Sequence, residues 1–303
     1  MHNAYSIKKT ILVTGSGGQL GMELWKISEQ YPVYNFLFTN RETLAIDNVN
    51  AVNNFFDQQQ IDYCINCAAY TAVDKAEKEK EKAYLINADA AGNLASVCKA
   101  HQTQFIHIST DYVFDGEASV PYTEDDKISP QNIYGASKLR GEELVLNNNP
   151  SSIIIRTSWV YSFFGNNFVK TMLRLLAEKE SINVVSDQYG SPTYAADLAS
   201  VIMTIIYKSS SEIIDTGIFN FCNAGVITWF DFAVAIKDYI KSDCKVIPIP
   251  TTQYPTPAKR PHYSVLNTEK IKNTFNLHIP NWKTSLHECL SLLTENGISK
   301  TLN

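Results

Sequence analysis

The sequence predicts an α/β protein built on a Rossmann-type, doubly wound parallel sheet with a smaller C-terminal α/β lobe. Three observations support this fold class. Strand-like and helix-like segments alternate through the first half of the chain, and a glycine-rich turn follows the first strand. Apolar runs such as Ile153–Ile155 are typical of strands covered on both faces, which is the situation in a parallel sheet.

Two sets of segments build the expected first half. β-branched and aromatic runs predict strands at Thr10–Thr14, Val33–Phe38, Ile61–Cys67, Gln104–Ser109 and Ser152–Val160. Apolar residues at helical spacing predict helices at Gln19–Glu29, Ala51–Gln58, Ala76–His101 and Tyr134–Leu146. Each of the first four strands is therefore followed by a helix, as βαβ units require.

The alternation is less regular after about residue 160. Helices are expected at Phe168–Glu178, Ala195–Tyr207, Trp229–Ile240, Thr268–Phe275 and Trp282–Leu293, and strands at Gly217–Cys222 and Lys245–Ile249. The late strand at Gly217–Cys222 can rejoin the first sheet, which would make the smaller domain discontinuous. Five of the 11 prolines lie in Pro248–Pro261, which predicts an extended loop without regular structure.

Length and composition exclude several classes of protein. The 303 residues carry a formal net charge of −5 with 45% apolar residues, which suits a globular protein of two domains or one enlarged domain. Because no run approaches the ~18 apolar residues of a membrane span, and glycines interrupt the apolar segment after Lys9, we expect neither a membrane anchor nor a signal peptide. The mild acidity also argues against nucleic-acid binding.

Six cysteines are scattered along the chain, with one C-x-x-C pair at Cys64 and Cys67. Side chains three apart on a strand point to opposite faces, so these two sulfurs should not meet. No second C-x-x-C and no histidine cluster completes a zinc site. We therefore expect reduced thiols in a cytoplasmic protein and predict no metal ligands from the residues alone.

The glycine-rich turn at Gly15–Gly21 has the spacing G-x-x-G-x-x-G between a strand and a helix. Gly15 suits the tight turn, Gly18 lets a pyrophosphate approach the main chain, and Gly21 lets the helix pack closely on the strand. The helix N-terminus then offers free N–H groups to phosphates. The spacing predicts a dinucleotide site, and a glycine turn without a ligand is the alternative.

The end of the second strand indicates which dinucleotide binds. An NAD-binding loop usually has an acidic residue there to hold the ribose hydroxyls, whereas this chain has Arg41, which suits a 2′-phosphate. NADP(H) is therefore favoured, and the neighbouring Glu42 leaves NAD(H) open. Asp47 is placed either to reach the adenine edge or to cap the following helix.

The pair Tyr134 and Lys138 stands at the start of an expected helix, where residues four apart share one face. A cation beside a phenol lowers the pKa of that phenol, so Tyr134 is expected to exchange protons near neutral pH. Thr110 and Asp111 follow a strand at the edge of the sheet where ligands bind. Thr110 would hold a substrate carbonyl together with Tyr134. The alternatives are a Thr110 bonded to the backbone and an Asp111 that only forms a turn.

These motifs resemble those of the extended short-chain dehydrogenase/reductases, and the likeness runs nearly end to end. The matching segments are Gly15–Gly21, Asn66–Glu77, Ser109–Phe114, Tyr134–Lys138, Arg156–Tyr161, Gly165–Leu173, Asp187–Thr193 and Tyr254–Ser264. The segments RTSWVY, DQYGSPT and YPTPAKRP are the most specific of these, and they are similar to the dTDP-4-dehydrorhamnose reductase branch of the family.

The resemblance implies a role for each matching residue. Tyr134 would be the proton donor, Lys138 its activator and the anchor of the nicotinamide ribose, and Thr110 the hydroxyl partner. Asp111 and Trp159 would contact a sugar nucleotide. The cofactor would lie along Gly15, Gly18, Gln19, Leu20, Gly21, Arg41, Asp47, Ala68, Ala69, Thr71, Tyr134 and Lys138.

Three positions depart from the family pattern, and one further position matches a metal ligand of the family without completing a metal site. Cys67 stands where the family often has Ala, Tyr70 where it often has His, and Ile108 where a Tyr is expected; these changes would tune cofactor contacts without removing the chemistry. Some members hold Mg²⁺ at a dimer contact. Glu23 matches one such ligand, but the sequence completes no site, so Mg²⁺ and a homodimer are the least supported implications.

The resemblance also implies a domain division and a reaction. A dinucleotide-binding Rossmann domain at 1–160, completed by about 194–225, would be joined to a smaller sugar-nucleotide-binding domain at 161–193 and 226–303. Hydride would pass from NAD(P)H to C4 of dTDP-4-dehydro-L-rhamnose, giving dTDP-L-rhamnose for surface polysaccharide such as the O-antigen of lipopolysaccharide. The nucleotide sugar is thus the expected small-molecule partner.

Three rival functions share the fold. Sugar-nucleotide 4-epimerases and other reductases stay open as relatives of the same chemistry. A 4,6-dehydratase typically has Glu after Thr-Asp as the acid that eliminates water. This chain has Tyr112 at that position, which argues against dehydration. A non-catalytic subunit, similar to the NADP-binding regulatory subunit of methionine adenosyltransferase, is the third, and the intact set of Thr110, Tyr134, Lys138 and Trp159 argues against it.

Overall fold

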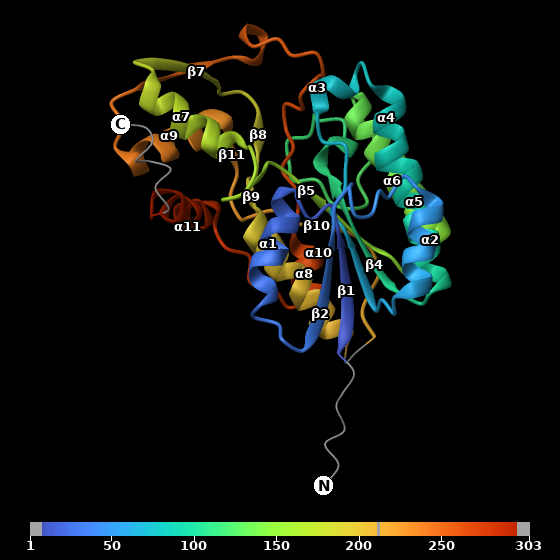
Figure 1. Ribbon diagram of the computed structural model, residues 1–303. Coiled ribbons are helices and arrows are strands. Elements are labelled where there is room, and N and C mark those ends of the chain that lie inside the picture. The colour runs from blue at the N-terminus through green and yellow to red at the C-terminus, as the bar shows by residue number, and fades with distance from the viewer. Residues whose placement is uncertain (1–7, 211–212, 296–303) are drawn as a thin grey trace.

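A parallel β-sheet forms the centre of the computed structural model, which describes residues 8–210 and 213–295 (Figure 1). Within those ranges six strands pair in the order β10-β5-β4-β3-β1-β2, and every pairing is parallel. Their bounds are β1 Lys9–Thr14, β2 Tyr34–Thr39, β3 Tyr63–Asn66, β4 Gln104–Thr110, β5 Ile153–Thr157 and β10 Gly217–Asn220. The predicted fold class, a Rossmann-type doubly wound sheet, is confirmed.

The order of the strands creates a crevice at the carboxyl end of the sheet. After β1 the chain moves outward to β2 and then returns past β1 to β3, so the connections after β1 and β3 diverge. Ligands of open α/β sheets bind at such a switch point. The register sets Thr14, the last residue of β1, beside Asn66, the last residue of β3. The glycine turn and the segment after Asn66 therefore share this crevice.

Helices cover both faces of the sheet (Figure 1). On one face α1 packs against α8 with α10 beside β10, and on the other face α2, α5 and α6 lie side by side. Ile11 and Val13 of β1 point to the first of these layers and Leu12 to the second, which explains the continuous apolar run. The bounds are α1 Gln19–Ser28, α2 Val49–Gln58, α3 Val73–Ala76, α4 Lys80–Tyr84, α5 Ala90–Ala100, α6 Ile133–Asn148, α8 Ala195–Ser209 and α10 Glu269–Thr274.

A second lobe, at the upper left of Figure 1, has its own apolar core. Its short strands form the pairs β12-β7, β11-β8 and β6-β9, and Tyr161, Phe232 and Leu286 are among the side chains buried between these strands and the helices. Its elements are β6 Val160–Tyr161, α7 Phe168–Glu178, β7 Ser181–Val185, β8 Tyr189–Gly190, β9 Thr193–Tyr194, β11 Ile227–Thr228, α9 Trp229–Ile240, β12 Lys245–Ile249 and α11 Trp282–Glu295.

The long helix expected at Ala76–His101 is present but begins later, because α4, a π-helical turn at Leu85–Asp89 and α5 form one continuous run from Lys80 to Ala100. The short helix α3 precedes it as a separate element. Asn87 lies in the π-helical turn, and its side-chain amide accepts from the main-chain N–H of Tyr70 and donates to the carbonyl of that residue. Asn87 thus satisfies both main-chain groups of Tyr70 in the segment after β3.

The strand expected at Ser152–Val160 is too long, because β5 ends at Thr157. Trp159 has a φ of 48°, in the left-handed region that a continuing strand cannot use. The chain turns there, and Val160 and Tyr161 pair with β9 in the second lobe. This turn carries the main chain out of the sheet at the crevice.

The proline-rich segment expected to have no regular structure contains two short elements. Pro248 belongs to β12, and a 3₁₀ turn follows at Thr251–Gln253. Among the described residues β12 pairs only with β7, so the missing N–H of Pro248 is tolerated at the free edge. The short strands β7, β8, β9 and β11 were not predicted, since two to five residues give almost no periodic signal.

The late strand rejoins the first sheet, where β10 pairs with β5. It is shorter than expected, ending at Asn220 and not at Cys222. The domain division at 1–160, about 194–225, 161–193 and 226–303 stays a prediction, and its first seven and last eight residues lie outside the described part of the chain.

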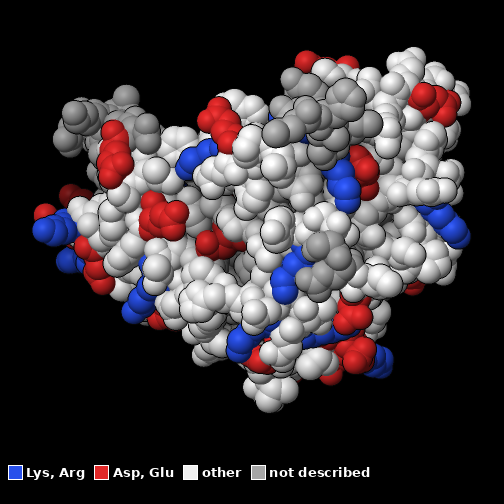
Figure 2. Space-filling view, turned by 90° about the horizontal axis from the view of Figure 1, so that it is seen from below, with Lys and Arg blue, Asp and Glu red and all other residues white. Residues whose placement is uncertain are grey.

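The surface mixes charges of both signs. Figure 2 views the molecule from below, where β1 begins, and shows blue and red side chains interspersed on that face. In the described part of the chain no helix is long and apolar enough to cross a membrane.

Candidate active site

Two glycines of the turn, Gly15 and Gly21, are required by the packing of the protein itself, because a side chain at either position would clash with the main chain. Gly15 has a φ of 67°, and a Cβ there would lie 2.6 Å from the main-chain nitrogen of Ala68. A Cβ on Gly21 would lie 2.7 Å from the carbonyl oxygen of Gly15. By contrast, a Cβ on Gly17 would meet no described atom within 4 Å. The open side of the turn thus leaves room for a ligand to approach the main chain.

The same turn presents the N-terminus of α1. Gly18 is the N-cap residue, and in the described structure no side chain caps the first turn. Gln19 ties this terminus to the second lobe, because its amide donates to the Val160 carbonyl at 3.3 Å and accepts from Asn167 at 3.0 Å. Free N–H groups and the partial positive charge of the helix end are suited to phosphates.

Every site residue predicted from the sequence lines one cavity of about 830 Å³ at the carboxyl end of the sheet. These residues come from the glycine turn, the ends of β2 to β5, and α6. They are Gly15, Gly18, Gln19, Leu20, Gly21, Arg41, Asp47, Ala68, Ala69, Thr71, Thr110, Asp111, Tyr134, Lys138 and Trp159. The fold therefore brings together segments that are up to 144 residues apart in the sequence, counted from Gly15 to Trp159.

At one end of the cavity Arg41 and Asp47 face each other, with Arg41 Nη2 3.6 Å from Asp47 Oδ2. The Arg41 side chain is 70% exposed, so it is free to turn toward a ligand. Asp47 does not cap α2, because Asn48 does so by accepting from the main-chain N–H of Ala51. Of the two roles expected for Asp47, helix capping is therefore excluded, and contact with the adenine edge of a cofactor in the cavity stays a prediction.

Tyr134 stands in the first turn of α6, which Asn132 caps by accepting from the Gly135 N–H at 2.8 Å. Burial raises the pKa of Tyr134 to about 12, and Asp111 adds to this while a hydrogen bond with Thr110 opposes it. The expectation that Lys138 lowers this pKa is therefore wrong. The reason is burial of the phenol, which outweighs the groups that lower its pKa.

Lys138 is only 1% exposed. Its Nζ lies 2.6 Å from the carbonyl oxygen of Ile108, to which it donates, and 3.1 Å from Nε2 of His107. Burial lowers the pKa of Lys138 to about 8, although Glu142 and Cys67 act in the opposite direction. Both a neutral and a charged lysine are thus accessible near neutral pH.

Thr110 and Asp111 close the floor of the cavity, and both are buried. The Thr110 hydroxyl donates to Asp111 Oδ1 at 2.9 Å, while Oδ2 of Asp111 has no hydrogen-bond partner among the described residues. Burial raises the pKa of Asp111 to about 7. A buried acceptor without a partner costs free energy, so this oxygen is suited to a donor group from a ligand.

Trp159 lines the side of the cavity that faces the second lobe. It stacks on Trp229 with ring centroids 3.5 Å apart and planes at 9°. A Cβ on Gly190 would lie 2.4 Å from the indole, so only glycine leaves space for it. Both rings are half-buried and line the cavity, which suits aromatic side chains that contact a ligand better than plugs of a core.

Sequence reasoning missed three residues of this site: Asn66, His107 and Trp229. Asn66 and His107 are buried in the sheet behind Lys138, where Asn66 Nδ2 lies 3.0 Å from His107 Nδ1. A polar residue inside an otherwise apolar strand was the available signal for both of them. Trp229 opens α9 directly after its N-cap Thr228, and nothing in the local pattern indicates that it meets Trp159.

Glu23, which matches one magnesium ligand of the family, does not fit a metal site. Its side chain is completely buried, and Oε1 accepts from the Ser162 hydroxyl at 2.6 Å. Its other oxygen, Oε2, has no hydrogen-bond partner among the described residues. In residues 8–210 and 213–295 no group of three or more His, Cys, Asp or Glu side chains could hold a metal. All six cysteines are unpaired thiols.

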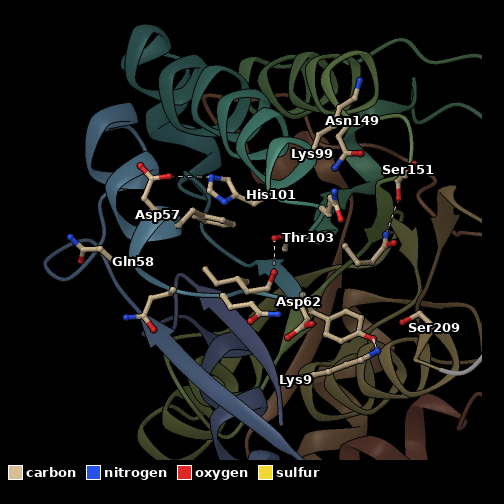
Figure 3. A pocket seen from close by; sticks show the side chains of 17 residues that line it. Lys9, Asp57, Gln58, Asp62, Lys99, His101, Thr103, Asn149, Ser151 and Ser209 are labelled. Atoms are coloured by element: carbon tan, nitrogen blue, oxygen red, sulfur yellow. Dashed lines mark hydrogen bonds and ion pairs between the residues drawn. The ribbon is translucent and has the colours of Figure 1, made fainter. Parts of the chain in front are cut away.

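A second cavity, of about 770 Å³, lies at the opposite, amino end of the sheet (Figure 3). None of the predicted site residues lines it. Two of its polar contacts are internal: Lys9 Nζ lies 3.3 Å from the Tyr63 hydroxyl, and the Thr103 hydroxyl donates to the Ile61 carbonyl at 2.7 Å. We assign this cavity no chemistry.

Comparisons with known proteins agree on one family. The model of the RmlD substrate binding domain matches residues 9–295. A curated dTDP-4-dehydrorhamnose reductase of Aggregatibacter actinomycetemcomitans is 42% identical over 283 residues, 91% of this chain and 96% of that protein.

Two solved structures are similar over nearly their whole length. A dTDP-4-dehydrorhamnose reductase of Clostridium acetobutylicum is 43% identical with a TM-score of 0.90, covering 94% of this chain and 99% of that one. The dTDP-4-dehydrorhamnose reductase of Bacillus anthracis, solved in complex with NADP, is 38% identical with a TM-score of 0.89 and the same coverage.

Proposed function

The chain belongs to the RmlD substrate binding domain family, and we propose that it reduces the C4 ketone of dTDP-4-dehydro-β-L-rhamnose to dTDP-L-rhamnose with NADPH. The observation that carries this proposal is the make-up of a single cavity. It combines an uncapped glycine-turn helix, a protonated phenol beside a threonine hydroxyl, a buried lysine and a stacked tryptophan pair.

The nicotinamide cofactor supplies the hydride when it is bound. The chain offers its phosphates the open glycine turn and the free N-terminus of α1, at Gly17 and Gly18. Arg41, exposed at the far end of the cavity, suits the 2′-phosphate of NADP(H). A relative with 38% identity was solved with NADP, which supports the same cofactor here. The residues present therefore fit this cofactor, and NADPH is the form we propose.

Tyr134 donates the proton that the reduced C4 oxygen needs. Its raised pKa, about 12, keeps the phenol protonated in the free enzyme, which is the state a general acid must have. Thr110 stands beside Tyr134, and its hydroxyl, which donates to Asp111 Oδ1 in the free chain, turns to the same oxygen when the substrate binds. Lys138, one turn along α6, holds the ribose hydroxyls of the cofactor.

The second lobe and Asp111 select the sugar nucleotide. The stacked rings of Trp159 and Trp229 give the deoxysugar a flat apolar surface, and the unpartnered Oδ2 of Asp111 accepts from a sugar hydroxyl. Orienting the C4 ketone in this way is worth more than binding alone, because reacting atoms must be aligned.

The test is oxidation of NADPH by the purified full chain with dTDP-4-dehydro-β-L-rhamnose as the sole acceptor. We expect one dTDP-L-rhamnose for each NADPH oxidised. Binding of NADPH without oxidation would support a non-catalytic subunit instead. Faster turnover of a 4-keto sugar attached to another nucleotide would move the chain to a different sugar-nucleotide reductase. Running the same assay with NADH measures the preference between the two cofactors.

Two further parts of the proposal concern the cell and the assembly. We place the enzyme in the cytoplasm, in keeping with six unpaired cysteines, and expect its product to supply surface polysaccharide. A homodimer is the assembly we expect, and a measurement of mass in solution tests it. Mg²⁺ is not included in the proposal, because the surroundings of Glu23 do not fit it.

A further inference from the structure

The side chain of Gln19 connects the first turn of α1 to the second lobe. Its amide donates to the Val160 carbonyl at 3.3 Å and accepts from Asn167 Nδ2 at 3.0 Å. Gly165 packs against the stem of this side chain, because a Cβ on Gly165 would lie 3.1 Å from Gln19 Cγ. Gln19, Val160 and Gly165 all line the carboxyl-end cavity, so the contact joins two walls of the proposed active site.

The donors and acceptors of this contact match in one way only. The main-chain N–H of Lys170 can only donate, so Asn167 Oδ1 accepts from it at 3.1 Å. The NH₂ group of Asn167 then donates to the Ser162 carbonyl at 2.7 Å and to Gln19 Oε1. Gln19 Nε2 is left to donate to the Val160 carbonyl. Flipping either amide would set donors against donors and acceptors against acceptors, so each side chain has one fitting orientation.

A second contact holds the same segment, but it lies inside the protein. Glu23, one turn further along α1, is completely buried, and its Oε1 accepts from the Ser162 hydroxyl at 2.6 Å. The Ser162 hydroxyl in turn accepts from the main-chain N–H of Phe164 at 2.8 Å. Gln19, by contrast, is only half-buried and stands at the helix end. Of the two contacts, the one made by Gln19 is therefore the one that a ligand at the helix end can influence.

The N-terminus of α1 is the least supported part of this helix. The N–H groups of a first helical turn have no partner within the helix, and in the described structure no side chain caps this terminus. Helix ends without such partners fray. Phosphates bound at Gly17 and Gly18 would pair these N–H groups and fix the turn that carries Gln19.

We propose that Gln19 and Asn167 are positioning residues through which a bound dinucleotide orders the sugar side of the cavity. The first turn of α1 is steadied when phosphates bind to it, and Gln19 holds the Val160 carbonyl and Asn167 in turn. Val160 directly follows Trp159, the ring expected to face the sugar. The inference rests on the proposed function for the identity of the two ligands.

The two ligands should therefore bind cooperatively. A wall that is already ordered loses less conformational entropy when the sugar nucleotide binds to it. The dinucleotide would raise the affinity for the sugar nucleotide, and by linkage the sugar nucleotide would raise the affinity for the dinucleotide by the same factor. Without the contact between Gln19 and Asn167, each ligand would bind independently of the other.

The direct test is hydrogen exchange of the main-chain amides in residues 160–171 of the full chain, with and without NADP⁺. In the wild type we expect exchange to be about threefold slower or more when NADP⁺ is bound. In Asn167→Ser we expect no such slowing, because the hydroxyl still caps α7 but is too short to reach Gln19. A merely structural role would change exchange equally with and without NADP⁺.

Two results of this measurement would overturn the inference. Slowing that persists in Asn167→Ser would mean that NADP⁺ contacts the segment directly. Exchange that is unchanged by bound NADP⁺ in the wild type would mean that Gln19 transmits nothing. Thr171→Ala is the matched control, because its hydroxyl donates to the Asn167 carbonyl at 2.9 Å and takes no part in the contact with Gln19. It should keep the full slowing.

A second variant removes the contact from the other side. Gln19→Met keeps the length of the side chain and the main-chain N–H, but it has neither the donor nor the acceptor of the amide. We expect the same loss of slowing as in Asn167→Ser, and the double variant should lose no more than either single variant. Losses that add up would mean that the two residues act independently, and the inference would be withdrawn.

The cooperativity itself is measured with dTDP-L-rhamnose, the product of the proposed reaction. We expect its Kd to be about fivefold lower or more when NADP⁺ saturates the wild type, and to differ by less than about twofold in Asn167→Ser. Equal Kd values in the wild type with and without NADP⁺ would contradict the inference. A chain that binds NADP⁺ but not dTDP-L-rhamnose would refute the proposed substrate, and the exchange measurement would still decide the role of Gln19 and Asn167.

Discussion

Two cavities of similar size open at opposite ends of one sheet, about 830 Å³ at the carboxyl end and about 770 Å³ at the amino end. The carboxyl-end cavity has buried groups that lack partners or have shifted pKa values, such as Asp111, Tyr134 and Lys138. The polar groups of the amino-end cavity are more exposed, with the Asp57 side chain 67% accessible beside His101.

Cavity volume by itself therefore does not identify the reactive cavity. At the amino end each strand begins, and the polar side chains there can turn toward water. At the carboxyl end the switch point between β1 and β3 gathers loops from several elements around groups that water does not reach. Burial shifts the pKa of an ionisable group, and it also leaves a donor or acceptor without a partner when no protein group or water reaches it.

The largest difference between the two cavities is expected when the proton donor is removed from the carboxyl-end cavity and a phenol hydroxyl is removed from the amino-end cavity. Tyr134→Phe keeps the ring but not the hydroxyl, so we expect kcat to fall ~10²–10⁴-fold with little change in the Kd of NADPH. Tyr63→Phe at the amino end removes a hydroxyl that lies 3.3 Å from Lys9, and it should leave kcat unchanged. Near-native turnover by Tyr134→Phe would mean that another group donates the proton.

The buried acid should make stability depend on pH. Because the pKa of Asp111 is about 7 in the folded protein and 3.8 ordinarily, the folded state keeps a proton that the unfolded chain loses. Stability therefore falls as pH rises from about 4 to 7. Asp111→Asn should flatten this fall, by up to about 4 kcal/mol since each pKa unit is ~1.4 kcal/mol. Parallel pH profiles of unfolding free energy in both proteins would refute this assignment.

The tryptophan pair tests whether the second lobe takes part in the carboxyl-end site. Trp159→Ala removes the ring that stacks on Trp229, so we expect kcat/KM for the sugar nucleotide to fall about 10–100-fold. The Kd of NADPH and the melting temperature should change little. A loss of ~3–5 kcal/mol of stability, with all ligands affected together, would identify Trp159 as a core plug instead.

The exposed cation at the far end of the cavity should discriminate between cofactors. Arg41→Ala is expected to weaken NADPH binding about tenfold, which corresponds to ~1.4 kcal/mol, and to leave NADH unchanged. Titration of both cofactors by fluorescence measures this. Lys99→Ala, which removes an exposed cation at the amino-end cavity, is the matched control and should affect neither cofactor. Equal losses for NADPH and NADH would assign Arg41 to adenine stacking.

The smallest effect is expected at the amino end. Asp57→Asn breaks the 3.6 Å contact with His101, which is exposed to solvent. Such surface changes stay within about 0.5 kcal/mol, so unfolding free energy, its pH profile and all kinetic constants should match the wild type. A clear loss of activity in this variant would show that the two ends of the sheet are coupled and that the amino-end cavity takes part in catalysis.

Local patterns in the sequence determined the fold class and most of the site. Glycines at this spacing between a strand and a helix predict the phosphate-binding turn, because the backbone of the turn requires them independently of the surrounding structure. The same holds for the one-turn spacing of Tyr134 and Lys138 and for strand ends that carry Thr110 and Asp111. Gly15 and Gly21 have the close approaches that the spacing predicted, and all fifteen expected residues line one cavity.

Tertiary structure alone decided how these groups behave. The pKa of Tyr134 rises instead of falling because the folded chain buries the phenol. The amine of Lys138 contacts Ile108 and His107, whose strand precedes α6 by more than twenty residues. The stacking of Trp159 on Trp229 joins residues 70 positions apart, and Asn87 of the π-helical turn bonds the main chain of Tyr70, 17 positions earlier. Burial and bond direction depend on partners from other elements, so no local pattern carries them.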